Sequence, residues 1–150
     1  MRVFINGFGR IGRSVLRAWL QAPARWPDLE IVGINDIAAP EMCAYLFEYD
    51  SVFGPWRGSV ALDEACLVVD GVAIPLHRTP DISGLNLAGV DVVMECTGRA
   101  DARDVAERGL RAGARRVLVS GPSSAADLTV VLGANDAMLG DQPIVSNASC

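Results

Sequence analysis

Three glycines between residues 6 and 12 constrain this chain more than any other feature, because they follow the pattern G-x-G-x-x-G. The apolar run 3–5 before them predicts a buried strand, and residues 14–20 after them predict a helix. In such a turn Gly7 permits the tight bend, Gly9 lets the backbone approach a pyrophosphate, and Gly12 lets helix pack on strand. The N–H groups that begin the helix then face the diphosphate. A glycine-rich turn can also be a plain loop, so the rest of the chain has to supply the context.

The composition indicates one globular domain. A chain of 150 residues buries roughly 68–70% of its unfolded surface, which is enough for a hydrophobic core. The apolar share of 51% suits a sheet covered on both faces, or a domain that buries further surface against a partner. The net charge of -5 comes without a basic stripe, which argues against nucleic acid as a partner.

Neither a membrane span nor a secretion signal is predicted. No run of about 18 apolar residues occurs, and the N-terminus lacks the layout of a signal peptide. The cysteines have no CxxC spacing, so we expect no metal site and no disulfide framework. They are Cys43, Cys66, Cys96 and Cys150. We therefore expect a cytoplasmic protein, with its single histidine, His77, on the surface.

Strand and helix patterns alternate in the first part of the chain. Residues 30–35 predict a second strand, which forms with the first a βαβ unit of the usual right hand. Residues 40–47 predict a short helix with Met42, Leu46 and Phe47 facing the core. A loop is expected over residues 50–55. Three short strands joined by acidic and glycine turns then predict an antiparallel excursion around residues 59–76.

The alternation resumes in the second part. Residues 91–96 predict a central strand, residues 101–112 a helix that stops at Gly113, and residues 116–120 another strand. Further apolar runs lie at residues 128–132 and 144–146. The predicted fold class is therefore α/β: a Rossmann-type, doubly wound and mostly parallel sheet, with helices on both faces and the small antiparallel excursion.

An acidic residue, Asp36, closes the second strand about 24 residues after Gly12. That offset is close to the ~20 residues at which a carboxylate accepts hydrogen bonds from the adenosine ribose. An acid at this place can also be a helix cap or a turn former. A 2′-phosphate about 4 Å from the carboxylate would cost on the order of 1–4 kcal/mol in like-charge repulsion. The sequence therefore favours NAD over NADP.

Small or polar residues end each strand of the second part: Thr97 with Gly98, Ser120 with Gly121, and Ser146 with Asn147. Ligands of open α/β sheets bind outside the carboxyl ends of the strands, so these stretches are expected to line one crevice with the glycine turn. Small residues can also simply end strands. Arg78 is open to two interpretations, as an adenine contact or as a solvated surface residue.

Five motifs in order resemble the phosphorylating glyceraldehyde-3-phosphate dehydrogenases. They are NGFGRIGR at 6–13, ND at 35–36, YDSV at 49–52, CTGR at 96–99 and SNASC at 146–150. The resemblance implies an NAD-binding domain over residues 1–150, with the catalytic second domain absent from this chain. It implies that the backbone of Arg10 and Ile11 holds the pyrophosphate and that Asp36 binds the ribose. The implied cofactor-binding set is Gly7, Gly9, Arg10, Ile11, Gly12, Asn35, Asp36, Arg78, Thr97, Gly98 and Ser120.

The resemblance also implies that Cys150 is the catalytic nucleophile and that Ser149 and Cys150 contact the substrate. In that family the thiolate adds to an aldehyde phosphate, and inorganic phosphate opens the resulting thioester. A free thiol of pKa ~8.5 needs a helix N-terminus or an imidazolium to ionise near neutral pH. A buried inert thiol is the alternative for Cys150. Homotetramers are usual in the family.

The sequence departs from the family at several positions. Phe53 stands where histidine is usual, and Ala100 where an aromatic residue is usual. Residues 120–124 are SGPSS in place of the commoner SAPAK. These changes leave the NAD prediction intact but allow another aldehyde, such as erythrose 4-phosphate.

Other functions stay open on sequence alone. The second half of the family enzymes, with its histidine base and phosphate-binding arginines, has no counterpart in these 150 residues. We therefore expect the chain alone to bind NAD weakly and to turn over no aldehyde. The alternatives are a non-catalytic NAD-binding or redox-sensing module, and a purely structural α/β domain.

Overall fold

The structure, a computed structural model, describes residues 1–148 of the chain. Its helices are α1 (Arg10–Gln21), α2 (Pro40–Glu48), α3 (Arg103–Ala106) and α4 (Arg108–Arg111), with 3-10 turns η1 (Pro23–Arg25), η2 (Ile82–Gly84) and η3 (Asp136–Met138). Its strands are β1 (Arg2–Asn6), β2 (Glu30–Asn35), β3 (Tyr49–Asp50), β4 (Gly54–Pro55), β5 (Val60–Asp63), β6 (Cys66–Val69), β7 (Val72–His77), β8 (Val92–Glu95), β9 (Arg116–Val119), β10 (Leu128–Thr129) and β11 (Ile144–Ser146).

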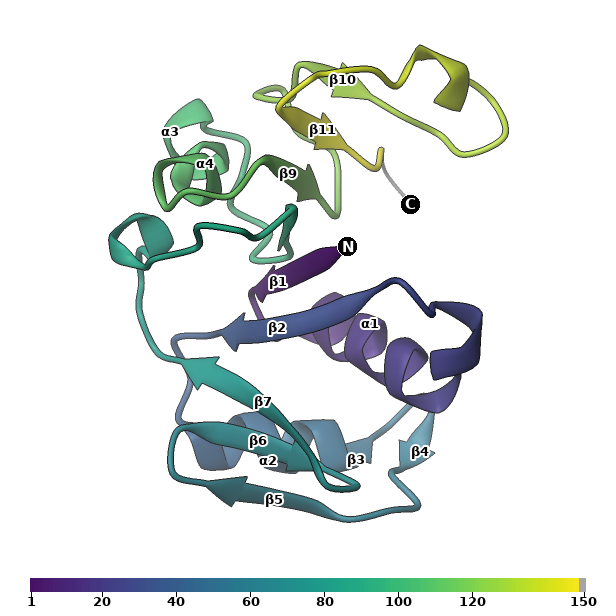
Figure 1. Cartoon of the computed structure of the whole chain (residues 1–150), viewed down its shortest axis with the longest axis vertical. Helices are drawn as coiled ribbons and strands as arrows, with labels where there is room; N and C mark the ends of the chain where they lie inside the picture. The colour runs from purple at the N-terminus through teal and green to yellow at the C-terminus, as the bar shows by residue number, and fades with distance from the viewer. Residues whose placement is uncertain (149–150) are drawn as a thin grey trace.

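One sheet organises the described residues. Nine strands lie in the order β10-β11-β9-β8-β1-β2-β7-β6-β5 (Figure 1). All neighbours from β10 to β7 are parallel, whereas β7, β6 and β5 pair antiparallel. The parallel part has the strand order of a Rossmann fold, and its order reverses between β1 and β8. The predicted fold class is confirmed, and the antiparallel excursion proves to extend the main sheet through the pairing of β7 with β2.

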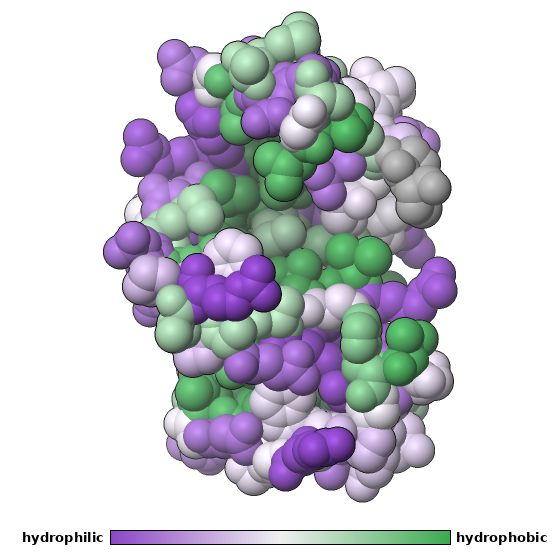
Figure 2. Space-filling view, turned by 90° about the vertical axis from the view of Figure 1, so that its right-hand side faces the viewer, coloured by the Kyte–Doolittle hydropathy of each residue, from purple (hydrophilic) through white to green (hydrophobic). Residues whose placement is uncertain are grey.

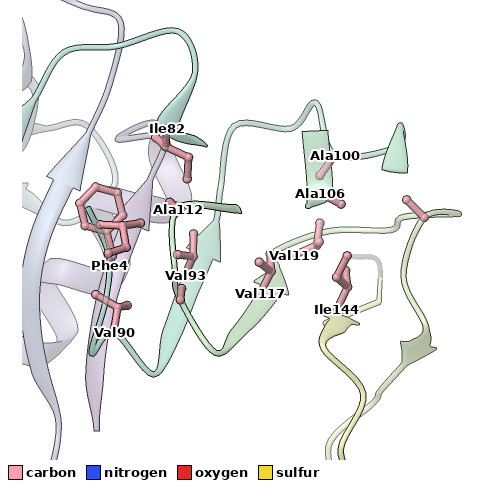
Figure 3. Close-up of a cluster of buried hydrophobic side chains, with 13 residues drawn as sticks. Phe4, Ile82, Val90, Val93, Ala100, Ala106, Ala112, Val117, Val119 and Ile144 are labelled. Carbon is pink, nitrogen blue, oxygen red and sulfur yellow. The ribbon is translucent and has the colours of Figure 1, made fainter. Parts of the chain in front are cut away.

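Successive residues of β1 serve two separate cores, because side chains of a strand alternate between its faces. Val3 and Ile5 pack on one face with Leu16 of α1 and Phe47 of α2. Phe4 packs on the other face, in a cluster with side chains of β8, β9 and α3 (Figure 3). The sheet is therefore covered on both faces, which explains much of the high apolar share.

The buried face of α2 differs from the prediction. Cys43 and Phe47 are buried, whereas Met42 is 50% exposed and Leu46 is 36% exposed. Residues four apart lie on the same side of a helix, so Cys43 and Phe47 share the stripe that contacts the sheet. The prediction was right for Phe47 and wrong for the two residues beside that stripe.

The helix predicted over residues 101–112 is shorter and interrupted. It consists of α3 and α4, separated at Glu107, where φ is −79° and ψ is −9°. This ψ lies well away from the ideal value of about −42°. Gly113 follows α4 with φ +105°, which is the left-handed stop that the sequence predicted.

Three smaller predictions also differ. Residues 50–55 lie in a hairpin of β3 and β4 rather than in a plain loop. Within its turn, Asp50 Oδ1 accepts hydrogen bonds from the backbone N–H groups of Val52 and Phe53. The run 128–132 is a strand only at its first two residues, and Leu132 is 86% exposed. His77 ends β7 and is half-buried, with its ring centroid 5.7 Å from that of Phe4.

Large apolar side chains also remain on the surface. Tyr45, Tyr49 and Phe53, from α2 and the following hairpin, are exposed, and the two tyrosine rings lie 4.9 Å apart. Figure 2 shows hydrophobic residues gathered around a hollow in the middle of one face. Within residues 1–148, the helices are all too short or too polar to cross a membrane.

Packing of α4 on the sheet gives a test of the fold. A Cβ added to Gly109 would lie 3.0 Å from side-chain atoms of Val93 and Val117. We expect Gly109→Val to lower the free energy of unfolding by about 1–3 kcal/mol, the usual cost of overpacking a filled core. Urea unfolding of the two proteins measures the difference. Gly84→Val is the control, because a Cβ there meets no atom within 4 Å; an equal loss in both variants would contradict the packing.

Candidate nucleotide-binding site

A cavity of about 430 Å³ lies at the carboxyl ends of the central strands, where the strand order reverses. This is the place at which open α/β sheets bind their ligands. The volume is within the usual range for small-molecule sites, roughly 300–1,000 Å³. Its lining residues are Asn6, Gly7, Gly9, Asn35, Asp36, Ile37, Thr79, Pro80, Cys96, Thr97, Arg99, Val105 and Arg108.

The glycine turn forms one wall of this cavity, and its three glycines have different surroundings. Gly7 has φ +95°, and a Cβ there would lie 2.7 Å from the backbone at the end of β8. A Cβ on Gly12 would lie 2.2 Å from the carbonyl oxygen of Gly7. A Cβ on Gly9 would meet no protein atom within 4 Å, although Gly9 lines the cavity. Two glycines therefore permit close packing, and the third leaves space on the cavity side.

The N-terminus of α1 opens beside Gly9. Among residues 1–148, no side chain caps this end of the helix, and the first helical bond runs from Arg13 N to Gly9 O at 3.0 Å. Arg10 and Ile11 are exposed in the first turn. Uncapped N–H groups carry the positive end of the helix dipole, which attracts an anion. With the space at Gly9, these residues fit a dinucleotide diphosphate.

Asp36 holds the glycine turn as well as facing the cavity. Its Oδ2 accepts a hydrogen bond from Phe8 N at 2.7 Å, and its Oδ1 accepts one from Ala38 N at 2.8 Å. A carboxylate has about four lone-pair sites, so both oxygens can still accept from ribose hydroxyls. Asp36 can therefore stabilise the turn and bind a ribose at the same time.

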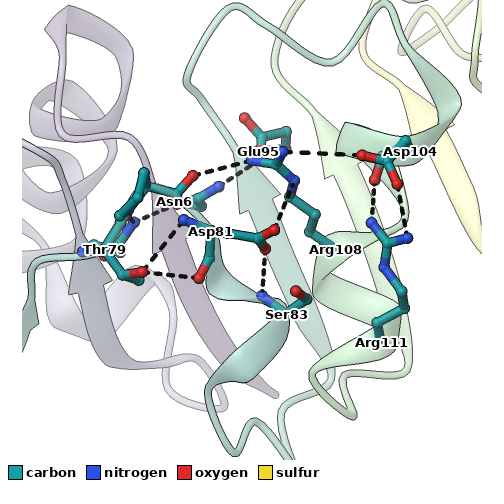
Figure 4. A network of polar contacts seen from close by, with 10 residues as sticks. Asn6, Thr79, Asp81, Ser83, Glu95, Asp104, Arg108 and Arg111 are labelled. Atoms are coloured by element: carbon teal, nitrogen blue, oxygen red, sulfur yellow. Dashed lines mark hydrogen bonds and ion pairs between the residues drawn. The ribbon is translucent and has the colours of Figure 1, made fainter.

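Five hydrogen-bonded residues, here called the polar belt, connect the end of β7 with the end of β8, and all of them except Glu95 line the cavity (Figure 4). They are Thr79, Asn35, Asn6, Glu95 and Thr97. Asn35 Oδ1 accepts from Thr79 N at 2.9 Å, and Asn35 Nδ2 donates to Asn6 Oδ1 at 2.8 Å. Asn6 Nδ2 donates to Glu95 Oε2 at 2.6 Å. The other oxygen, Glu95 Oε1, accepts from Thr97 N at 2.9 Å and from the Thr97 hydroxyl.

The remaining predicted residues lie around the cavity rather than in its lining. Arg78 is exposed and its Nε donates to Ile37 O at 3.2 Å, next to Asp36. Gly98 has φ +72° in the turn after β8, and Ser120 is half-buried after β9. Ser149 and Cys150 lie outside the described residues.

Sequence reasoning missed several lining residues. Thr79 follows Arg78 directly and Arg99 follows Gly98, so their nearness to predicted residues was a usable signal. Val105 and Arg108 come from α3 and α4 and reach the cavity only through the tertiary fold. Arg108 is held there by a hydrogen bond from its Nη1 to Pro80 O at 3.0 Å and by Asp81, 3.6 Å away (Figure 4).

The cysteine in the cavity lining is not an activated thiol. Burial raises the pKa of Cys96 to about 11 and outweighs the lowering effect of a hydrogen bond with Ser120. Burial, followed by the nearby charge of Asp36, also raises the pKa of Cys43 to about 11. Reactive cysteines have lowered pKa values, so neither residue is suited to be a nucleophile.

Residues 1–103 match the family model described as "Glyceraldehyde 3-phosphate dehydrogenase, NAD binding domain". The chain belongs to this glyceraldehyde 3-phosphate dehydrogenase family. It is 45% identical over 153 residues to the glyceraldehyde-3-phosphate dehydrogenase of Pseudomonas aeruginosa, with 100% of this chain and 46% of the relative covered. The corresponding enzyme of Geobacillus stearothermophilus is 40% identical over 154 residues, with 100% and 45% covered.

The cytosolic glyceraldehyde-3-phosphate dehydrogenase of Leishmania mexicana is 44% identical over 152 residues, with 100% of this chain and 45% of the relative covered. The chain thus spans about half the length of the curated relatives it matches. Family membership confirms the resemblance predicted from the five motifs, and NAD is the cofactor of this dehydrogenase domain.

The contrast between glycines gives a test of the NAD site. We expect Gly9→Val to change the free energy of unfolding by no more than about 1 kcal/mol, because a Cβ there meets no protein atom. It should abolish NAD binding, because its side chain occupies the space beside the helix N-terminus. Isothermal titration calorimetry and urea unfolding measure the two effects. Gly12→Val is the matched control and should unfold the turn; NAD binding by a folded Gly9→Val chain would contradict the site.

The raised thiol pKa values predict slow alkylation. Only the thiolate reacts, and at pH 7 a thiol of pKa 11 is ionised to roughly one part in ten thousand. We expect iodoacetamide to modify Cys43 and Cys96 slowly in the folded chain, with a rate that rises about tenfold per pH unit up to pH 9. Peptide mass spectrometry measures each site, and the urea-unfolded chain is the control. Rapid labelling of Cys96 in the folded chain at pH 7 would contradict this prediction.

Proposed function

We propose that these residues form the NAD-binding part of an enzyme that oxidises an aldehyde phosphate to an acyl phosphate, with glyceraldehyde 3-phosphate as the substrate. The observation that carries the proposal is the uncapped N-terminus of α1, which opens with Gly9 onto a cavity at the sheet reversal. The relatives' printed names support the substrate.

Different residues around the cavity bind different parts of NAD. The backbone at Arg10 and Ile11 holds the diphosphate, with Gly7, Gly9 and Gly12 giving it room. Asp36 and Asn35 serve the adenosine ribose side, with Arg78 at the rim beside Asp36. Thr97, Gly98 and Ser120 border the path toward nicotinamide. When bound, NAD accepts a hydride.

Cys150 is the proposed nucleophile, with Ser149 beside it at the substrate. Its thiolate adds to the aldehyde carbon while the carbonyl oxygen takes a proton from the protonated base, which gives a thiohemiacetal. The same base takes the hydroxyl proton back, and the hydride would go to NAD held by the residues named above, so that a thioester is left. Phosphate oxygen then attacks the carbonyl carbon, which releases the acyl phosphate and the thiolate.

The last described residues support this assignment. Ser146 ends β11 at the same edge of the sheet as the cavity, and its Oγ donates to Gly121 O at 2.7 Å. Ala148 follows with φ +60°, a left-handed conformation that costs a non-glycine residue about 1 kcal/mol or more. Such backbone strain is frequent next to functional residues.

The complete protein is proposed to be a cytoplasmic homotetramer with no nucleic-acid or membrane partner. Two relatives, from Leishmania mexicana and Trypanosoma brucei brucei, are named cytosolic. The exposed Tyr45, Tyr49 and Phe53 give an apolar surface that assembly could bury. The histidine base and the phosphate-binding groups are proposed to lie outside these 150 residues.

A chimera tests the proposed reaction. We expect residues 1–150 joined to the second half of the Pseudomonas aeruginosa relative to reduce NAD in the presence of glyceraldehyde 3-phosphate and phosphate. The 150-residue chain alone should not, because it lacks the base. NADH absorbance follows the rate, and erythrose 4-phosphate is compared under the same conditions.

Two substitutions in the chimera identify the nucleophile. Cys150→Ser should lower the rate by at least about a thousandfold, because a hydroxyl is far less ionised than a thiol. Cys66→Ser, on the antiparallel extension, is the matched control and should retain the rate. An active Cys150→Ser chimera would overturn the assignment, and turnover by the chain alone would overturn the division between domains.

A further inference from the structure

The carboxylate of Glu95 is buried behind two cavity-lining residues, Asn6 and Thr97, and is not needed for any role described so far. The residue is 2% exposed, and none of the ion pairs within residues 1–148 involves it. A buried charge is costly unless hydrogen bonds replace its water. Three donors do so here: Asn6 Nδ2, Thr97 N and the Thr97 hydroxyl. Glutamine would fill the same space without a buried charge, so the presence of a carboxylate at this position needs an explanation.

A carboxylate accepts hydrogen bonds and donates none, whereas asparagine and glutamine do both. Glu95 therefore forces Asn6 to turn its Nδ2 toward β8 and its Oδ1 toward Asn35. Asn35 has the matching direction: its Nδ2 donates to Asn6 Oδ1 and to Thr79 O, at 2.8 and 3.0 Å, and its Oδ1 accepts from the backbone N–H of Thr79. The backbone of Thr79 fixes the direction of the polar belt at one end, and the acceptor-only carboxylate of Glu95 is the group that agrees with that direction at the other end.

We propose that Glu95 is a positioning residue for NAD: its carboxylate fixes the direction of Asn6 in the polar belt and so holds Thr97 and Thr79, at the two ends of the belt, in the arrangement that binds the cofactor. Both threonines and both asparagines line the cavity. Figure 4 shows Asn6 between Thr79 and Glu95, with dashed lines for the contacts. The proposal rests on the NAD site argued above and adds the reason for an acid at this position.

Glu95→Gln tests the direction of the belt. If the new Nε2 faces Thr97 N, two donors meet at that wall. If the new Nε2 faces Asn6 instead, it meets Asn6 Nδ2, which is also a donor. Rotating the Asn6 and Asn35 amides by 180° would relieve that pair, but Asn35 Nδ2 would then face the N–H of Thr79, whose backbone cannot rotate in the same way. Every arrangement leaves one donor without an acceptor. We expect the Kd for NAD to rise about tenfold or more, as for one unsatisfied buried donor.

A double substitution provides the rescue. In Asn6→Asp with Glu95→Gln, the acceptor-only group moves to position 6 and the net charge is unchanged. The new amide at position 95 then donates to the carboxylate at position 6 and accepts from Thr97, and Asn35 keeps its direction. We expect the double variant to bind NAD within about threefold of the unsubstituted chain, because every hydrogen bond has a donor and an acceptor again. Asn6→Asp alone should bind poorly, because it sets two carboxylates against each other.

Two measurements on the full chain decide the proposal. Calorimetry gives the Kd for NAD of the unsubstituted chain, both single variants and the double variant, with Glu30→Gln as control. Glu30 is on β2 at the opposite end of the sheet, with its side chain 65% exposed, so its substitution should leave the Kd unchanged. Amide hydrogen exchange without NAD should show faster exchange at Thr97 or Thr79 in Glu95→Gln, and recovery in the double variant.

The possible outcomes distinguish a failure of the proposed role of Glu95 from a failure of the NAD site. If the unsubstituted chain binds no NAD, the site itself fails, and exchange at the two threonines still shows whether Glu95 orients the belt. Unchanged NAD binding by Glu95→Gln would overturn the proposal, and so would a double variant as weak as the single one. If Glu95→Gln does not fold, a double variant that folds and binds NAD supports the proposal, and one that fails overturns it.

Discussion

The contact between the glycine turn and the end of β8 is the constraint on which the rest of the site depends. A Cβ on Gly7 would lie 2.7 Å from Thr97 N, so a larger residue would push the turn away from the strand. This contact brings the N-terminus of α1 to the point where the strand order reverses. The helix dipole and the polar strand ends then act on one volume rather than on two separate surfaces.

Residues after the strands hold this arrangement while leaving hydrogen-bonding capacity for a ligand. Asp36 ties the glycine turn to β2 through Phe8 N, and the polar belt ties the ends of β7, β2, β1 and β8 together. The ribose contact proposed for Asp36 and the geometry of the turn are therefore coupled. Replacing Asp36 to change the cofactor would also release the Phe8 amide, so the effects on specificity and on turn structure would appear together.

Features that depend on neighbouring residues in the sequence could be predicted, whereas features that depend on contacts between distant segments could not. Strand periodicity and glycine spacing are local, and they predicted the parallel sheet, the excursion and a crevice lined by the glycine turn. Of the three small or polar strand ends expected to line that crevice, at residues 97–98, 120–121 and 146–147, only Thr97 does so. The buried side of α2 depends on the angle at which it meets the sheet, so Cys43 was missed in favour of Met42. Val105 and Arg108 line the cavity because the tertiary fold brings α3 and α4 to it, and nothing in their own segment indicates this.

Two of the departures from the family pattern, at position 100 and in residues 120–124, lie in contact with each other. Ala100, where the family usually has an aromatic residue, is buried, and its carbonyl oxygen accepts a hydrogen bond from Ser123 Oγ. Ser123 belongs to the 120–124 segment, which also departs from the family. A large ring at position 100 would occupy space near this segment, so the two departures are consistent with one repacking. Because neither Ala100 nor Ser123 lines the cavity, this repacking can vary without altering the residues that face NAD.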